Sequence, residues 1–185
     1  MKIIATCVGE RKNIDWKGVT ITTGIFKYPV TNPIFLDIED VVGDTVCDRE
    51  NHGGIDQAVY AYSLKHYEYW KGIYPNLNWQ LGMFGENLTI DDLDESKLHV
   101  GDIFKVGETV LEVTKPRLPC LKLGVRFNDM KMVKLFWKQN SPGLYFKIIQ
   151  TGFVKIGDEF TLIKSCPENL TITEVYQNKR EEKEV

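Results

Sequence analysis

The fold is decided by residues 103–124, which read Ile-Phe-Lys-Val-Gly-Glu-Thr-Val-Leu-Glu-Val-Thr-Lys-Pro-Arg-Leu-Pro-Cys-Leu-Lys-Leu-Gly. Two apolar runs, Ile103 to Val106 and Thr109 to Thr114, flank a Gly-Glu pair of the kind found in two-residue β-hairpin turns. Pro116 and Pro119 follow, and each proline fixes its own φ at about −65° and keeps the preceding residue extended. The sequence therefore predicts a β-hairpin that leads into a stiff, non-helical segment ending at Cys120.

Cys120 is the candidate functional side chain of this segment. Arg117 and Lys122 lie close to it in sequence, and nearby cations favour the thiolate, which is the form that binds metals. If an extended strand continues past Cys120, Lys122 lies on the same face as the sulfur. Two alternatives remain. A single cysteine is often only a small buried apolar residue, and Pro116-x-x-Pro119 could bind an SH3-type domain, although strand-like sequence on both sides disfavours this.

Composition limits the class of protein. A chain of 185 residues with 43% hydrophobic residues is long enough for a full core in one domain, and its net charge of −3 disfavours nucleic acid and anionic membranes as partners. Cys7, Cys47, Cys120 and Cys166 form no Cys-x-x-Cys pair, so neither a zinc cluster nor a disulfide scaffold is indicated. The apolar run from Ile3 to Val8 is too short for a signal peptide or membrane span. We expect a soluble cytoplasmic protein.

Short strand-like runs separated by glycine turns dominate the chain. Helices are expected from about Leu64 to Ile73 and from Asp129 to Gln139. About nine strands with two helices predict a mainly β fold, namely a closed or nearly closed barrel with helices outside it. We expect one domain over residues 1–176 and a charged, frayed tail over 177–185. The strand-like runs from which these strands are expected to form are residues 2–8, 19–27, 36–39, 45–47, 57–62, 88–90, 103–106, 109–114, 123–127, 144–150, 152–155 and 160–163.

A Gly-Asp pair precedes an apolar run at three places, ending at Asp44, Asp102 and Asp158. Glycine supplies a positive φ, and aspartate binds its own local backbone, so each pair predicts a turn at a strand entry. The flanking sequences do not match. We therefore interpret the three pairs as recurring turn chemistry and not as an internal repeat.

Two further polar stretches could face a pocket. The loop containing His52, Gly53 and Gly54 places adjacent glycines where backbone N–H groups can point at an anion. His52 could donate a proton or bind a metal, but no second ligand stands at metal-binding spacing. Glu86 and Asn87 follow a glycine-rich turn. For both stretches an ordinary loop is the alternative.

Four ordered motifs carry a family resemblance. They are Gly24-x-x-Lys-x-Pro-Val30, His52-Gly-Gly-x-Asp56, Phe84-Gly-Glu-Asn-Leu88 and Pro116-Arg-x-Pro-Cys-x-Lys-Leu123. Together they resemble the MOSC domain, named for the C-terminal part of molybdenum cofactor sulfurases, and within it the bacterial YiiM-like group. The resemblance implies a β-barrel and a molybdenum (molybdopterin) cofactor; pyridoxal phosphate is not expected. Relatives include the mitochondrial amidoxime-reducing components. Longer YiiM-like members continue into a helical C-terminal extension, whereas this sequence ends soon after Tyr176.

The resemblance also implies roles for individual residues. It makes Cys120 the ligand of molybdenum, and thiolate is the soft ligand that such a metal prefers. It makes Cys120, His52 and Glu86 the catalytic candidates. Basic side chains among the remaining candidates would neutralise the phosphate of the cofactor. The residues expected on the walls of the cofactor and substrate cleft are Lys27, Arg49, Gly53, Gly54, Asn87, Arg117 and Lys122.

The implied activity is reductive removal of oxygen from N-hydroxylated substrates such as hydroxylamino-purines and amidoximes. No Gly-x-Gly-x-x-Gly follows a strand, and no cysteine spacing fits an iron–sulfur cluster, so we expect a separate electron-donor protein. One alternative is a sulfur carrier with a persulfide on Cys120, although two prolines give that cysteine less mobility than a carrier needs. A non-catalytic molybdopterin-binding module is the other, and sequence does not separate it from a reductase.

Overall fold

A computed structural model of the protein describes residues 1–49 and 53–184. The named helical segments are η1 (Ile55–Gln57), α2 (Leu64–Ile73), α3 (Leu121–Arg126), α4 (Lys131–Lys138) and α5 (Ile172–Glu184). The strands are β1 (Ile3–Gly9), β2 (Lys12–Trp16), β3 (Val19–Thr23), β4 (Lys27–Val30), β5 (Ile34–Leu36), β6 (Val59–Ser63), β7 (Leu88–Ile90), β8 (Ile103–Val106), β9 (Thr109–Pro116), β10 (Leu144–Gln150), β11 (Gly152–Val154) and β12 (Phe160–Lys164).

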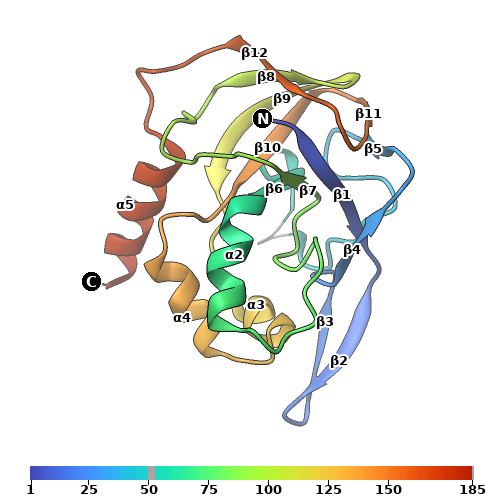
Figure 1. The fold of residues 1–185 in the computed structure, drawn as a ribbon, viewed down its shortest axis with the longest axis vertical. Helices are drawn as coiled ribbons and strands as arrows, with labels where there is room; N and C mark the ends of the chain where they lie inside the picture. The colour runs from blue at the N-terminus through green and yellow to red at the C-terminus, as the bar shows by residue number, and fades with distance from the viewer. Residues whose placement is uncertain (50–52, 185) are drawn as a thin grey trace.

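An eight-stranded sheet forms the body of the molecule, in the order β12-β8-β9-β10-β6-β7-β1-β4 (Figure 1). Its pairs are antiparallel except for β6 with β7. Two small sheets, β2 with β3 and β5 with β11, complete the strands of the described residues, and the β2–β3 hairpin projects from the body (Figure 1). The mainly β fold is therefore confirmed.

The predicted closed barrel is not confirmed, because β12 and β4 end the described sheet without pairing with each other. β1 has β7 and β4 as its partners, so only its first residues are available to the segment before β12. There Ile3 donates to the carbonyl of Asp158 and accepts from the N–H of Gly157, each at 2.9 Å. These bonds and an isolated bridge between Lys2 and Glu159 fasten β1 to that segment without closing a ladder.

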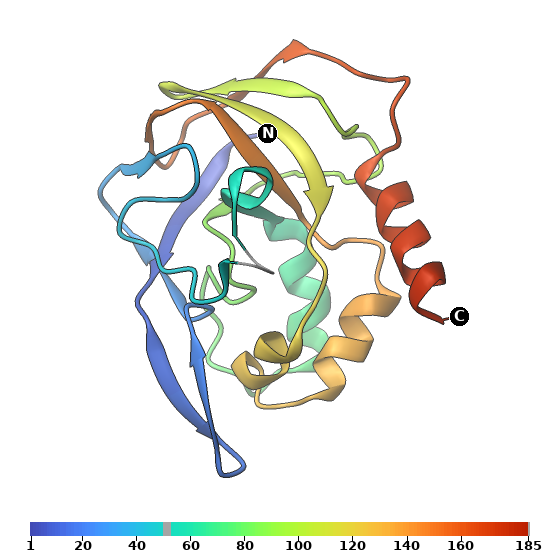
Figure 2. The ribbon, with the colours of Figure 1, turned by 180° about the vertical axis from the view of Figure 1, so that it is seen from behind.

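The predicted hairpin is present as β8 and β9, with Gly107 at φ 55° in its turn and Val106 opposite Thr109. β9 runs two residues further than expected, to Pro116, since its end pairs with β10. A proline at the end of a strand removes no hydrogen bond that the ladder needs. The chain then runs without regular structure from Arg117 to Cys120 and turns into α3 (Figure 2).

The strand predicted over residues 123–127 is wrong, because α3 occupies Leu121–Arg126. Leu123, Val125 and Phe127 are all buried, and this alternation imitates the period of a strand. Gly124 permits the close packing of Met130 on this helix, since a Cβ there would lie 2.6 Å from the Met130 sulfur. Lys122 is consequently on a helix and not on an extended strand beyond Cys120.

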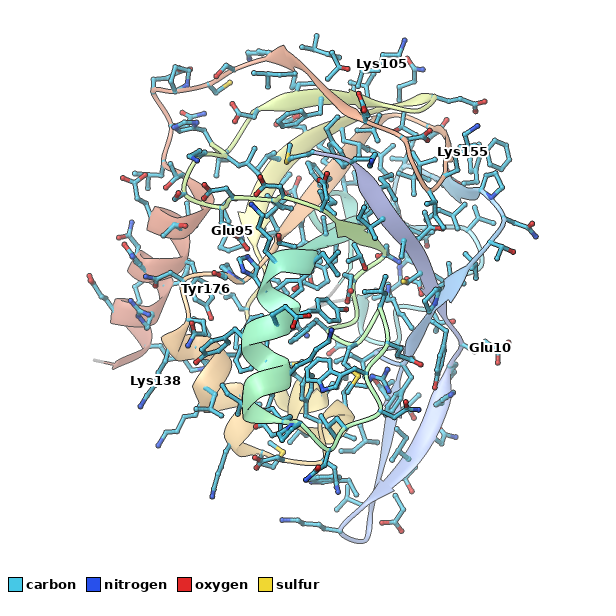
Figure 3. All side chains as sticks on the ribbon, viewed as in Figure 1. Glu10, Glu95, Lys105, Lys138, Lys155 and Tyr176 are labelled. Atoms are coloured by element: carbon cyan, nitrogen blue, oxygen red, sulfur yellow. The ribbon has the colours of Figure 1, made fainter. Side chains whose placement is uncertain are left out.

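The C-terminal residues differ from the expected frayed tail, since α5 continues to Glu184. A capping box starts this helix: the backbone N–H of Thr171 donates to the Glu174 carboxylate at 2.7 Å, and the Thr171 hydroxyl accepts from the backbone N–H of Glu174 at 3.2 Å. Tyr176 points from α5 into the body of the protein (Figure 3) and donates to the carbonyl of Phe136 on α4 at 3.0 Å. α5 is thus packed along α4.

Two apolar clusters stabilise this arrangement. One contains apolar side chains of the large sheet, including the buried residues Ile90, Leu111 and Phe146. The other is largely aromatic and contains side chains of β6, α2 and α4. Within it, the Trp70 indole of α2 donates to the Tyr62 hydroxyl of β6 at 2.8 Å. This aromatic cluster supports one side of the cavity described below. No helix in the described part of the chain is long and apolar enough to span a membrane.

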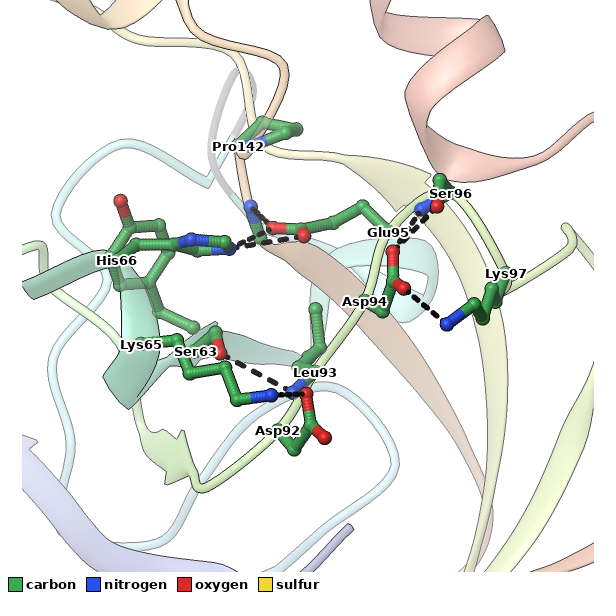
Figure 4. A network of polar contacts seen from close by, with 12 residues as sticks. Ser63, Lys65, His66, Asp92, Leu93, Asp94, Glu95, Ser96, Lys97 and Pro142 are labelled. Atoms are coloured by element: carbon green, nitrogen blue, oxygen red, sulfur yellow. Dashed lines mark hydrogen bonds and ion pairs between the residues drawn. The ribbon is translucent and has the colours of Figure 1, made fainter. Parts of the chain in front are cut away.

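A polar network fixes the turn after β7 to the start of α2 (Figure 4). The buried carboxylate of Glu95 contacts the His66 ring at 3.1 Å and accepts from the backbone N–H of Gly143 at 2.8 Å. Asp94 accepts from the backbone and the hydroxyl of Ser96 in the same turn. The network ties the segment that precedes β10 to α2.

Candidate functional site

A cavity lies where β4, β6 and the segment after β9 come together. Its walls contain five of the residues expected at the site, namely Lys27, Asn87, Arg117, Cys120 and Lys122. The sequence places these residues on three separate segments, around residue 27, around residue 87 and over residues 117–122, so the fold brings them together. We take this cavity as the candidate active site.

Cys120 is half-buried in the wall and has an extended backbone, with φ −129° and ψ 176°, immediately before α3. Its carbonyl accepts the backbone N–H of Leu123 at 3.0 Å, which begins the helix. On the other side, Leu144 of β10 lies opposite Pro116 of β9. The cysteine is therefore fixed between a paired strand and a helix.

Arg117 is the most unusual polar residue of the cavity, since it is charged and yet only 6% exposed. It lies over the rings of Tyr60 and Phe136, each 5.3 Å from its centre, and its Nη1 atom has no hydrogen-bond partner among the described residues. A buried cation with an unsatisfied donor is costly unless something pairs with it. An anionic group in the cavity would satisfy this donor, so the residues present fit a cofactor that carries phosphate.

Lys27 is also buried, but its charge is already paired. Its ammonium forms an ion pair with Asp44, and the two side chains are 8% and 3% exposed. Lys122 has a weaker neighbour, the Asp48 carboxylate at 3.5 Å. Arg117 and Lys122 are therefore the cations that contribute most of the positive field in the cavity.

Asn87 lines the cavity, but its amide joins the surrounding strands. The Nδ2 group donates to the Asp44 carboxylate at 2.9 Å and to the carbonyl of Cys7 at 3.3 Å, and Oδ1 accepts from the backbone N–H of Tyr60 at 3.3 Å. Both donors and one acceptor position are thus occupied. Asn87 shapes the wall and has no spare donor for a ligand.

Glu86 is fully buried and does not line the cavity. Its carboxylate accepts from the backbone N–H groups of Gly82 at 2.9 Å and Phe84 at 3.1 Å, and from the hydroxyls of Tyr67 and Thr89. Burial raises its pKa, and the bond from the Tyr67 hydroxyl opposes that rise. The structure gives Glu86 the geometry of a residue that holds the 82–89 loop.

The other predicted residues that the structure describes lie away from the cavity wall. Arg49 is an exposed side chain that pairs with Asp40 at 2.9 Å and Glu39 at 3.0 Å; Asp40, and then Glu39, raise its pKa. His52 lies outside the described residues. Gly53 and Gly54 precede η1 and are not among the residues that line the cavity.

Sequence reasoning did not identify several residues of the cavity wall. Tyr60 and Tyr145 sit on paired strands beside Arg117, and Gln57 belongs to η1. Tyr60 falls in the strand predicted over residues 57–62, and a tyrosine in a strand carries no local signal of a binding role. Cys47 also lines the cavity, although its surroundings were read as an ordinary strand.

Known proteins resemble this chain in sequence and in fold. The MOSC domain matches residues 48–161. YflK of Bacillus subtilis (strain 168) is 33% identical over 172 residues, which is 92% of this chain and 76% of that protein. A protein of Gibberella moniliformis named "Reductase" is 33% identical over 80% of this chain but only 27% of its own length. The crystal structure of YiiM from Geobacillus stearothermophilus has a TM-score of 0.80 and 28% identity, covering 100% of this chain and 86% of that one.

Proposed function

Because the chain belongs to the MOSC domain family, we propose that it binds the molybdenum cofactor and reduces N-hydroxylated compounds such as hydroxylamino-purines and amidoximes. The observation that carries the proposal is the pairing, in one cavity, of the Cys120 thiol with the unsatisfied donor of buried Arg117. The fungal relative named as a reductase supports the oxidoreductase class. When bound, the cofactor would supply the two-electron chemistry.

Each cavity residue has a distinct task in this proposal. Cys120 would hold the metal, and its position between β9 and α3 keeps the sulfur from moving. Arg117 and Lys122 would donate hydrogen bonds to anionic groups of the cofactor. Tyr60 and Phe136, which flank Arg117, keep its guanidinium oriented toward the cavity.

We propose in addition that a separate protein delivers the electrons. The sequence has no dinucleotide-binding fingerprint and no cysteine spacing for an iron–sulfur cluster. Lys115, Arg117 and Lys122 surround Cys120 in sequence, which favours an acidic donor in a weak, charge-steered contact. We expect donor-driven turnover to fall as salt rises, because the Debye length is roughly 8 Å at physiological ionic strength. Turnover with a small uncharged reductant should not fall.

The proposal is tested on protein made in a host that synthesises molybdopterin. Wild-type chain and the Cys166→Ser variant should retain molybdenum in stoichiometric amount, whereas Cys120→Ser should lose it while circular dichroism stays unchanged. Cys166 is a suitable control because it is buried away from the cavity, where its backbone N–H donates to Asp102 at 2.8 Å. Loaded wild-type protein should reduce an amidoxime with an artificial reductant.

Equal molybdenum in wild type and Cys120→Ser would contradict the role of Cys120. Persulfide on Cys120 by mass spectrometry, without reductase turnover, would contradict the proposed reaction and indicate sulfur transfer. Metal content and turnover are measured on the same preparation, so binding without reaction would identify a non-catalytic cofactor-binding module.

A further inference from the structure

The three Gly-Asp turns do not have the same role in the structure. Asp102 accepts the backbone N–H of His99 at 2.9 Å, and Asp158 accepts that of Lys155, also at 2.9 Å. Each bond reaches back three residues and closes the turn in which the aspartate lies. Both carboxylates therefore close their own turns, as turn chemistry predicts, and Asp102 also accepts the backbone N–H of Cys166 at 2.8 Å.

Asp44 follows a glycine with the same left-handed backbone, since Gly43 has φ 84°. Here a backbone bond closes the turn, from the N–H of Asp44 to the carbonyl of Val41 at 3.0 Å. Within the described ranges, no donor from this turn reaches the Asp44 carboxylate. Its Oδ1 instead accepts the backbone N–H of Gly9 at 2.8 Å, and its Oδ2 accepts from Lys27 and from the Asn87 amide.

The Asp44 carboxylate therefore lies directly behind the cavity wall. Lys27 and Asn87 line the cavity, whereas Asp44 does not. The next residue, Thr45, packs so closely on Gly24 that a Cβ at Gly24 would lie 1.9 Å from the Thr45 carbonyl oxygen. This contact and the bond to Gly9 fix the backbone and the carboxylate of Asp44 in place.

The buried pair also sets the charge of the cavity. Two opposite charges in contact cancel most of their field at a distance, and the interior screens them less than water does. An anion in the cavity is therefore attracted by Arg117 and Lys122 more than by Lys27. Removal of the Asp44 charge would leave the Lys27 ammonium uncompensated.

We propose that Asp44 is a positioning residue that holds Lys27 in the cavity wall and limits how strongly the cavity attracts anions. The inference rests on the proposed function only in that the cavity binds an anionic group. It assigns a functional role to one of three turn motifs that are alike in sequence.

The first test measures the position of Lys27 in the full-length, cofactor-free chain. An amine-reactive reagent is applied to wild type, Asp44→Asn and Asp158→Asn, and modification of Lys27 is followed by mass spectrometry. Asp44→Asn should label Lys27 at least several-fold faster, because the ammonium loses its buried partner. Asp158→Asn, which breaks a turn away from the cavity, should label it at the wild-type rate. Equal rates in wild type and Asp44→Asn would overturn the inference.

The second test measures binding of inorganic phosphate by calorimetry. Asp44→Asn should bind phosphate about three- to tenfold more tightly than wild type, since one nearby negative charge is removed. The double variant Lys27→Gln/Asp44→Asn should return close to the wild-type affinity, and Asp158→Asn should match wild type. A merely structural role predicts weaker binding in Asp44→Asn, so weaker, unchanged or undetectable binding there would overturn the inference.

The two proposals can fail separately. If wild-type protein retains no molybdenum but Asp44→Asn changes Lys27 labelling and phosphate affinity as expected, the reductase proposal fails and the role of Asp44 stands. If molybdenum is retained through Cys120 and Asp44→Asn changes neither measurement, the role of Asp44 fails alone.

Discussion

Replacing Arg117 with methionine should make the cofactor-free protein more stable while removing its ability to hold the cofactor. In the structure Arg117 is 6% exposed, and the Nη1 atom of its guanidinium has no partner among the described residues. The side chain is therefore kept at a cost to the fold. Such a cost is expected at a binding site and not at a residue whose role is packing.

The expected change in the free energy of unfolding follows from the interactions of Arg117 that the variant loses. An unsatisfied buried donor costs about 1–3 kcal/mol, and burial of the cation adds several kcal/mol. The contacts with Tyr60 and Phe136 return about 2 kcal/mol each, and methionine retains the apolar packing. The balance favours Arg117→Met by about 1–3 kcal/mol, which raises the thermal midpoint by about 2–10 °C in a chain of this length.

The assay is urea unfolding of cofactor-free protein, combined with molybdenum analysis of protein from a molybdopterin-competent host. Arg126→Met is the matched control: Arg126 also has buried nitrogen atoms without partners and lies 4.7 Å from the Phe26 ring centre, but it does not line the cavity. Both variants should gain stability, and only Arg117→Met should lose molybdenum. Destabilisation of Arg117→Met by more than about 1 kcal/mol would refute the reasoning.

Three further outcomes are expected. Glu86→Gln should lower the free energy of unfolding, measured in urea, by about 2–4 kcal/mol, because the amide cannot accept from all four donors that bind the carboxylate. A loss of turnover with full stability would instead indicate a catalytic carboxylate. Gly24→Ala should lower the unfolding midpoint and displace the 45–48 segment, since the new Cβ would lie 1.9 Å from the Thr45 carbonyl oxygen. A crystal structure of the variant in which this segment has not moved would contradict the prediction. Hydrogen bonds from the Ser96 hydroxyl and then from Lys97 lower the pKa of Asp94 from 3.8 to about 2. The ionised carboxylate therefore stabilises the fold at pH values above 3.8, and this contribution is lost as the pH falls toward 2. Asp94→Asn should accordingly lose less stability than wild type over that interval, and parallel acid-unfolding curves would contradict this.

The sequence predicted those parts of the fold that depend on local chemistry. The β8–β9 hairpin and the extended path to Cys120 follow from a glycine turn and two prolines, which act on their immediate neighbours. The helix α2 was predicted with its observed bounds from its apolar stripe. By contrast, α3 was missed because alternating buried residues suggested a strand, while the contact of Gly124 with Met130 is tertiary.

The candidate site likewise has features that the sequence predicts and features that depend on tertiary contacts. Motifs placed Lys27, Asn87, Arg117, Cys120 and Lys122 at a common site through family resemblance, and the cavity brings them together. The motifs carried no information about which charges are already paired. The pairing of Lys27 depends on Asp44, which follows a glycine just as Asp102 and Asp158 do. Those two aspartates accept backbone N–H groups of their own turns, and the sequence does not show this difference.

The position of β10 has a consequence for the order in which the protein is made. β10 lies between β6 and β9, so it joins strands encoded before residue 91 to strands encoded after residue 102. Lys27 and Asn87 belong to the first group, and Cys120 follows the second. The two walls of the cavity are therefore united only after the ribosome has released residues 144–150, and pairing between distant segments is slow. Any group that binds in the cavity must accordingly wait for synthesis of residues 144–150, and a chain stalled before β10 would expose the Cys120 thiol without the opposite wall of the cavity.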